Sequence, residues 1–126
     1  MTYQIHLQQD EQIVHIVHRG AVDPMEMTGG KEGVFFYLRQ FGWRKILLDL
    51  AVADLQVGAT DVAAIFRRID DAFPAGAFIA VVQPREMAFD FCRFAKSVAE
   101  AWSRTQLEVF GDTDAARGWL VNQPTA

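Results

Sequence analysis

Strand-like and helix-like segments alternate strictly from Lys45 to the end of the chain, and this alternation limits the fold more than any other feature of the sequence. The expected strands span residues 45–50, 78–83 and 107–110, and the expected helices span residues 60–73, 84–103 and 112–121. Repeated strand–helix units build a mostly parallel sheet. The runs 46–48 and 78–82 are almost wholly apolar, which is typical of the interior strands of such a sheet.

The N-terminal residues predict an antiparallel hairpin at the edge of this sheet. Residues 3–8 alternate polar and apolar side chains, and residues 13–17 are mostly β-branched and apolar. If the chain turns at Asp10-Glu11, His6 faces His15 across the two strands. His18 then points to the opposite face from His15, because side chains alternate along a strand.

A helical region is expected between the hairpin and Lys45. Asp23-Pro24 matches a helix N-cap followed by proline at the first helical position. Gly29-Gly30 is expected to interrupt the helix, so that a second segment runs from about Lys31 to Phe41 and stops at Gly42. These glycines, with Gly33, either let the region hinge as a lid or supply a loop with positive φ. The whole chain is therefore predicted to be an α/β domain with a five-stranded sheet and four to five helices.

Size and composition favour one water-soluble domain. With 126 residues, 51 % of them hydrophobic, the chain can bury one core. We expect a single domain over residues 1–122 and a short flexible tail over 123–126. The formal charge of −4 provides no bulk positive field for a phosphate backbone, so nucleic acid is not an expected partner. One cysteine, no signal-peptide pattern and no membrane-spanning run favour a cytoplasmic location.

Several motifs resemble the SpoIIAA-like family, whose members are related to the STAS domains of anti-sigma-factor antagonists and similar in fold to CRAL-TRIO lipid-binding domains. These motifs are the opening hairpin, the strand Ile46-Leu47-Leu48-Asp49-Leu50, the strand at 79–82 and the closing run from Val109-Phe110-Gly111-Asp112 to Trp119-Leu120. The resemblance implies a βα superhelix with an antiparallel first strand. It also implies a role in holding hydrophobic ligands or associating with membranes.

The phosphorylation site of the antagonist relatives is altered in this chain. Their Asp-Ser-Ser-Gly motif begins the helix after the strand that corresponds to residues 45–50. Here Val-Gly-Ala-Thr occupies residues 57–60, and Ala59 stands in the place of the phosphoserine. If the register slips by one residue, Thr60 takes the place of the phosphoserine. It would then lie at a helix N-terminus, which favours an anion such as phosphate. The alternative is that Thr60 is an ordinary N-cap.

The sequence contains no recognisable catalytic or metal constellation. His6 and His15 lack a third ligand, so a polar cross-strand pair is favoured over a zinc site. No Ser-centred elbow, Gly-rich phosphate loop or HExxH motif is present. An enzyme would need a buried cluster such as Asp49, Asp54 and His18, which the spacing does not predict. We therefore expect a protein that is not an enzyme and needs no cofactor or metal.

Three aromatic residues are the candidate binding residues. Phe36 and Phe89 each fall among polar side chains of their helices, and Trp43 follows the first helical region. Packing under a loop is one explanation for them. The functional explanation is that they line a pocket mouth, contact a membrane peripherally or form a homodimer surface.

Two functions follow as hypotheses. In the first, the domain holds a small hydrophobic or lipid-like molecule between the sheet and the helices at 31–41 and 84–103. In the second, it is a regulatory protein–protein interaction module of the STAS type that lacks the usual phosphoserine.

Overall fold

A mixed five-stranded sheet forms the centre of the molecule. The computed structural model describes residues 3–85 and 91–125, with side chains from residue 93 onward in the second range. Its elements are, in chain order, β1 (Tyr3–Gln8), β2 (Ile13–Val22), α1 (Pro24–Phe41), β3 (Lys45–Leu55), α2 (Ala59–Arg67), α3 (Ile69–Ala72), β4 (Ala77–Val82), α4 (Phe91–Ala99), β5 (Thr105–Phe110) and α5 (Thr113–Val121). The strand order is β1-β2-β3-β4-β5, with β1 antiparallel to β2 and all other pairs parallel. The predicted α/β class and sheet are confirmed.

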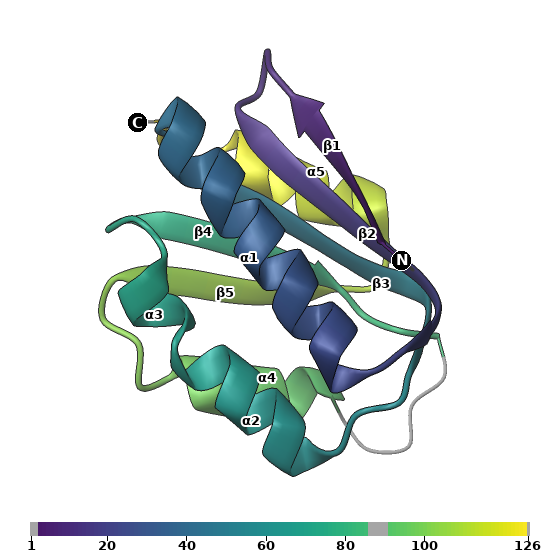
Figure 1. Cartoon of the computed structure of the whole chain (residues 1–126). Coiled ribbons are helices and arrows are strands. Elements are labelled where there is room, and N and C mark those ends of the chain that lie inside the picture. Colours follow the sequence, from purple (N-terminus) through teal and green to yellow (C-terminus); the bar gives the residue numbers. More distant parts are fainter. Residues whose placement is uncertain (1–2, 86–90, 126) are drawn as a thin grey trace.

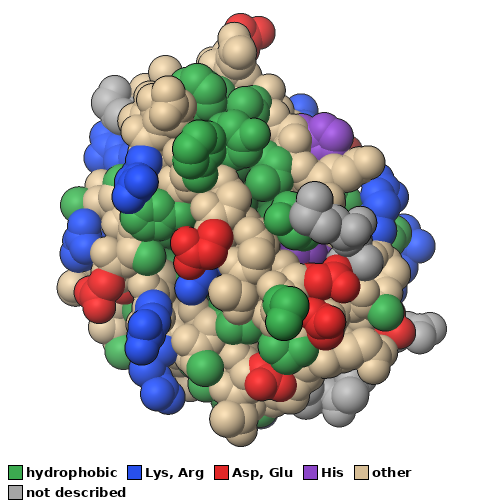
Figure 2. All heavy atoms as spheres, in the orientation of Figure 1, with side chains coloured by type: hydrophobic (Ala, Val, Ile, Leu, Met, Phe, Trp, Pro, Cys, Tyr) green, Lys and Arg blue, Asp and Glu red, His purple; other side chains and the backbone are tan. Residues whose placement is uncertain are grey.

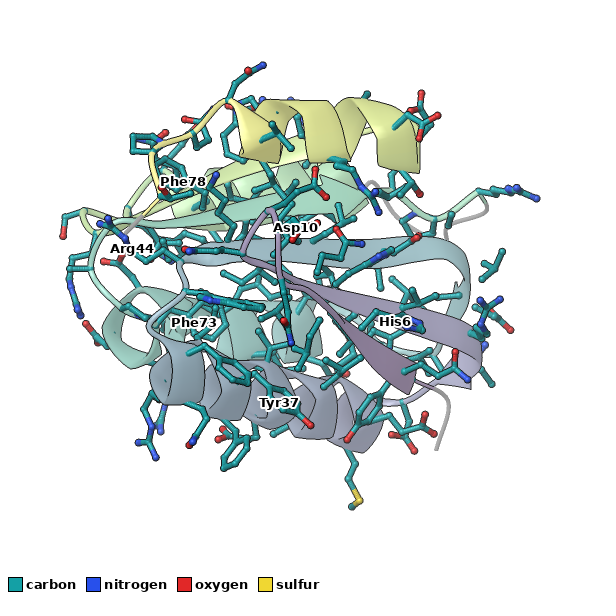
Figure 3. The ribbon with its side chains drawn as sticks, turned by 90° about the horizontal axis from the view of Figure 1, so that it is seen from above. His6, Asp10, Tyr37, Arg44, Phe73 and Phe78 are labelled. Carbon is teal, nitrogen blue, oxygen red and sulfur yellow. The ribbon has the colours of Figure 1, made fainter. Side chains whose placement is uncertain are left out.

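The helices divide unequally between the two faces of the sheet. Figure 1 shows α1, α2, α3 and α4 on one face and α5 alone on the other. A large buried cluster fills the space under α1–α4, and a smaller one lies under α5. Figure 3 shows Phe73 on the α1 side of the sheet and Phe78 on the α5 side. Strand alternation sends successive side chains to these two cores, so each face has its own chemistry.

The hairpin register agrees with the prediction from the sequence. His6 pairs with His15, and Tyr3 pairs with His18 at the far end of the ladder. Asp49 contacts His15 on the α5 face, whereas His18 lies against Gly30 of α1 on the other face. The two histidines of β2 therefore belong to different environments.

α1 is one continuous helix, so the predicted interruption at Gly29-Gly30 is wrong. Its start is as predicted, since the Asp23 carboxylate accepts the Glu26 backbone N–H at 2.8 Å, and Gly42 ends it with a φ of 71°. The glycines serve close packing instead of a loop. A Cβ added at Gly30 would lie 2.8 Å from Ile16 Cδ1 and 3.0 Å from two ring atoms of His18. α1 therefore lies with its backbone directly on β2.

Two other helices differ from the predicted boundaries. The helix expected at 60–73 is broken at Arg68 into α2 and α3, although its predicted core face is buried. That face consists of Val62, Ile65, Phe66, Ile69 and Phe73. Pro84 and Arg85 lie outside any helix, and α4 covers Phe91–Ala99. Part of the helix predicted at 84–103 lies outside the described residues.

Alanine substitutions at the two adjacent glycines of α1 test its close approach to the sheet. Gly30→Ala places a methyl group against Ile16 and His18, and we expect a loss of about 1–3 kcal/mol of unfolding free energy, as in other overpacked cores. At Gly29 the nearest atom is the Tyr3 hydroxyl, 3.7 Å away. Gly29→Ala should therefore stabilise the protein by about 0.5–1 kcal/mol through helix propensity. Urea unfolding measures both, and equal effects at the two sites would contradict the packing described.

Candidate functional site

A narrow apolar recess lies between the sheet and the helices α1, α2 and α3. Its walls include Ile16, Ile46 and Ile79 from three neighbouring strands, and Val34, Phe66 and Phe73 from the helical side. The unfilled space, counted out to open solvent, is about 490 Å³, but only about 40 Å³ of it is wide enough for a water molecule. A cavity that holds benzene has about 150 Å³. An apolar ligand therefore enters this recess only if part of the wall moves outward.

His18 is a buried polar group on the wall of this recess. The residue is only 2 % exposed, and its Nδ1 atom has no hydrogen-bond partner among the described residues. The ring lies between Gly30 of α1 and the ring of Tyr3, whose centroid is 5.6 Å away. Desolvation by burial lowers the pKa of His18 to about 4, so the imidazole is neutral at neutral pH. A neutral imidazole can donate one hydrogen bond and accept another.

Lys31 is a cationic residue on the wall of the recess. It belongs to α1, next to Gly30, and it lines the same space as His18. Its side chain is only 15 % exposed. The ammonium group lies 3.9 Å from a carboxylate oxygen of Glu32, a residue whose own side chain is 68 % exposed. An ion pair of that length with a solvated partner is weak.

A second polar cluster surrounds Asp49 on the opposite face of the sheet. The carboxylate accepts hydrogen bonds from Thr113 Oγ1 at 3.2 Å and from the Ala51 N–H at 3.1 Å, and it lies 3.3 Å from His15 Nε2. The hydrogen bond with His15 is the main cause that lowers the pKa of Asp49, against the opposing effect of burial. Gln8 Nε2 lies 3.4 Å from the other ring nitrogen of His15. The cluster ties the first turn of α5 to β2 and β3.

This second cluster does not have the arrangement of a nucleophile and its base. His15 and Thr113 both contact Oδ2 of Asp49, so the carboxylate lies between the imidazole and the hydroxyl group. A nucleophile would need its hydroxyl within hydrogen-bond reach of the base. The cluster of Asp49, Asp54 and His18 is not formed either, because Asp49 and His18 lie on opposite faces and Asp54 is exposed. Among the described residues, no group of three or more His, Cys, Asp or Glu side chains is placed to hold a metal ion.

Of the predicted aromatic residues, Phe36 is open to solvent and Trp43 is not. Phe36 is 55 % exposed and packs edge-to-face on Tyr37, with ring centroids 5.3 Å apart. Trp43 is 8 % exposed and stacks on Phe41 at 4.9 Å. For Trp43 the burial agrees with the packing explanation, because the turn at Gly42 brings the ring back over the core. Phe89 lies outside the described residues.

Four rings form a continuous aromatic strip along the C-terminal half of α1. We use this name for Phe36, Tyr37, Phe41 and Trp43, whose neighbouring centroids are 4.9–6.2 Å apart. Figure 2 shows hydrophobic side chains gathered in this part of the surface, beside the β1–β2 hairpin. The strip is exposed mainly through Phe36 and Phe41.

Thr60 is an exposed residue in the first turn of α2, and it is not the N-cap. The N-cap is Gly58, whose backbone N–H donates to Asp61 Oδ2 at 3.1 Å. This contact starts the helix at Ala59, one residue earlier than predicted. The cap explanation of Thr60 is therefore wrong, and its phosphorylation stays a prediction.

The sequence analysis did not identify His18 and Lys31 as members of one site. A signal for His18 was present, since it continues the inward-facing positions Val14 and Ile16 along β2. Lys31 carries no comparable signal. Its place at the recess follows from the unbroken path of α1 across the sheet.

Comparisons with known proteins identify the fold. No family model and no curated protein matches the sequence. Among solved structures, the chain is similar to an uncharacterised protein of the DUF3478 family from Shewanella loihica PV-4, described as having a SpoIIAA-like fold. The TM-score is 0.57 at 18 % identity, over 94 % of this chain and 91 % of that chain. The predicted SpoIIAA-like architecture is thus confirmed.

In the part of the chain that the structure covers, no helix combines the length and the hydrophobicity needed to cross a membrane.

The burial of His18 predicts a specific loss of stability in acid. The pKa of His18 is about 4 in the folded protein and 6.5 when the ring is in water, as in the unfolded chain. Between these two pH values the unfolded chain therefore binds a proton that the folded chain does not. Unfolding free energy should therefore fall between pH 6.5 and about 4, by about 3 kcal/mol in total. His18→Leu should remove this part of the pH dependence.

Urea unfolding at a series of pH values measures this effect. His6→Gln is the matched control, because His6 is an exposed histidine of the neighbouring strand. The control should keep the acid loss of the unsubstituted protein. An unchanged pH dependence in His18→Leu would show that His18 is not buried as a neutral ring.

Proposed function

We propose that this chain is a non-enzymatic binding domain that holds a small hydrophobic or lipid-like molecule in the recess between the sheet and α1–α3. The observation that carries the proposal is a buried nitrogen of His18, without a hydrogen-bond partner among the described residues, on the wall of a mostly apolar space. An unsatisfied buried polar group costs about 1–3 kcal/mol, and a ligand that bonds to it would recover much of this cost. The SpoIIAA-like fold supplies the architecture, and the ligand assignment rests on the recess itself.

The position of the ligand differs from the one expected from the sequence. The expected site lay between the sheet and the helices at 31–41 and 84–103. The recess does lie between the sheet and α1, but its other wall is formed by α2 and α3. Residues Ile65, Phe66 and Ile69 close it on the side away from the sheet.

The shape of the recess favours a slender molecule over one with fused rings. Little of its volume is wide enough for a water molecule, and the rest of the unfilled space is either narrower or open to solvent. Burying a methylene group contributes about 0.8 kcal/mol, so six methylenes contribute roughly 5 kcal/mol towards opening the recess and binding. A single alkyl chain meets this requirement with the smallest displacement of the wall.

The wall that moves in this proposal is α2–α3. At Gly30 the backbone of α1 packs closely on the side chains of Ile16 and His18 of β2, which allows little sliding. α2 and α3 meet the recess only through side chains, and the helix is already broken at Arg68. Side-chain packing can adjust by rotamer changes and small helix shifts, whereas a close backbone contact cannot.

In the same proposal, the aromatic strip is the surface that contacts a membrane. Phe36 is 55 % and Phe41 45 % exposed, and both project from α1, the helix that also lines the recess. Amphipathic and aromatic side chains are favoured at a membrane–water boundary. A peripheral contact through this strip would bring the recess next to the lipids that supply its ligand.

Binding of decanol, a neutral molecule with one alkyl chain, tests the proposed function. Calorimetric titration should show one molecule bound per chain, and thermal unfolding should shift upward in its presence. Val34→Leu adds a methylene group to the recess wall, so it should weaken decanol binding while leaving stability nearly unchanged.

Val22→Leu is the matched control, because Val22 is fully buried on the same side of the sheet but does not line the recess. This variant should lose about 1–3 kcal/mol of stability through overpacking and should keep its affinity for decanol. No binding by the unsubstituted protein, or unchanged binding by Val34→Leu, would refute the proposed site.

A further inference from the structure

We infer, on the basis of the proposed function, that the molecule held in the recess is an unbranched alkyl carboxylate whose head group lies between Lys31 and His18. The walls of the recess supply an apolar environment for the chain, and these two residues supply the polar contacts. The inference concerns the chemical class of the head group. It adds a requirement for negative charge that hydrophobic binding alone does not impose.

Lys31 supplies the first contact, because it is a mostly buried cation with a weak partner. Its side chain is 15 % exposed, and the carboxylate 3.9 Å from its ammonium group belongs to Glu32, which is 68 % exposed. A carboxylate at hydrogen-bond distance on the recess side would meet the ammonium in a less polar environment, where attraction is stronger. The flexible stem of a lysine lets the charge follow such a ligand.

His18 of β2 supplies the second contact. The His18 ring edge lies against Gly30, whose missing side chain admits the ring to within 3.0 Å of where a Cβ would be. Lys31 is the next residue along α1. The two polar groups are therefore neighbours across the interface of β2 and α1, and both line the recess. With its proton on Nδ1, neutral His18 donates to one carboxylate oxygen while Lys31 donates to the other.

The charges and hydrogen-bond donors of Lys31 and His18 match a carboxylate better than a phosphate or an amine. One ammonium and one neutral imidazole balance a single negative charge and offer a donor to each of two oxygens. A phosphate monoester carries a charge of about −1.5 to −2 and three strong acceptor oxygens, which these two groups cannot fully satisfy. An alkylamine would place its cation beside Lys31, where the two positive charges repel each other.

Three ligands with the same ten-carbon chain test the inference: decanoate, decanol and decyl phosphate. Dissociation constants for each are measured calorimetrically at neutral pH and low salt. We expect decanoate to bind at least about tenfold more tightly than decanol, the size expected when a charge-assisted hydrogen bond is added. We expect decyl phosphate to bind more weakly than decanoate.

Substitution of Lys31 then identifies the source of the preference. Lys31→Met keeps the length of the side chain and removes its charge, so it should abolish the preference for decanoate over decanol. Lys31→Arg should keep the preference. Lys96→Met is the matched control, because Lys96 is 54 % exposed and pairs with Glu108 of β5, away from the recess. This control should bind all three ligands like the unsubstituted protein.

The outcomes separate this inference from the proposed function. Equal binding of decanoate and decanol would overturn the carboxylate and leave a hydrophobic binding site. A decanoate preference that survives in Lys31→Met would overturn the position of the head group beside Lys31. Tighter binding of decyl phosphate would replace the carboxylate by a phosphate as the head group. Failure of all three ligands to bind the unsubstituted protein would overturn the proposed function as well.

Discussion

At Gly30 the backbone of α1 packs directly on the side chains of Ile16 and His18 of β2, and the recess depends on that contact. A side chain at this position would overlap Ile16 and His18, so only glycine lets the helix settle at this depth. The contact covers His18 and removes water from its ring, which lowers its pKa to about 4. The next residue along the helix, Lys31, lines the same recess. One close approach thus fixes both polar groups of the proposed site.

The two faces of the sheet have different roles because strand alternation separates their polar groups. On the α5 side, Asp49 has hydrogen-bond partners from two strands and a helix, and such a satisfied network holds elements together. On the α1 side, His18 Nδ1 has none among the described residues. Buried polar groups are nearly always paired, so an exception in an apolar recess indicates a place where a ligand group would fit.

Patterns of short range predicted most of the fold, whereas the site depends on contacts between distant segments. The pairing of His6 with His15 follows from alternation and one turn, and both are local. Gly30 was misinterpreted because helix propensity treats glycine as a breaker, while the nearness of β2 makes it necessary here. The sequence left open whether Trp43 is packed or exposed, because its burial depends on how the chain turns after α1. That Lys31 and His18 line the same recess could not be predicted from the sequence pattern of either segment alone.

Methyl NMR of the isoleucines in the presence of decanol tests the central claim most directly. Ile46, Ile65 and Ile79 line the recess, whereas Ile13 is equally buried but lies in the core under α5. The account predicts ligand-to-methyl cross-relaxation and chemical-shift changes at the first three residues, and none of comparable size at Ile13. Cross-relaxation to Ile13 instead, or to no buried isoleucine at all, would contradict it.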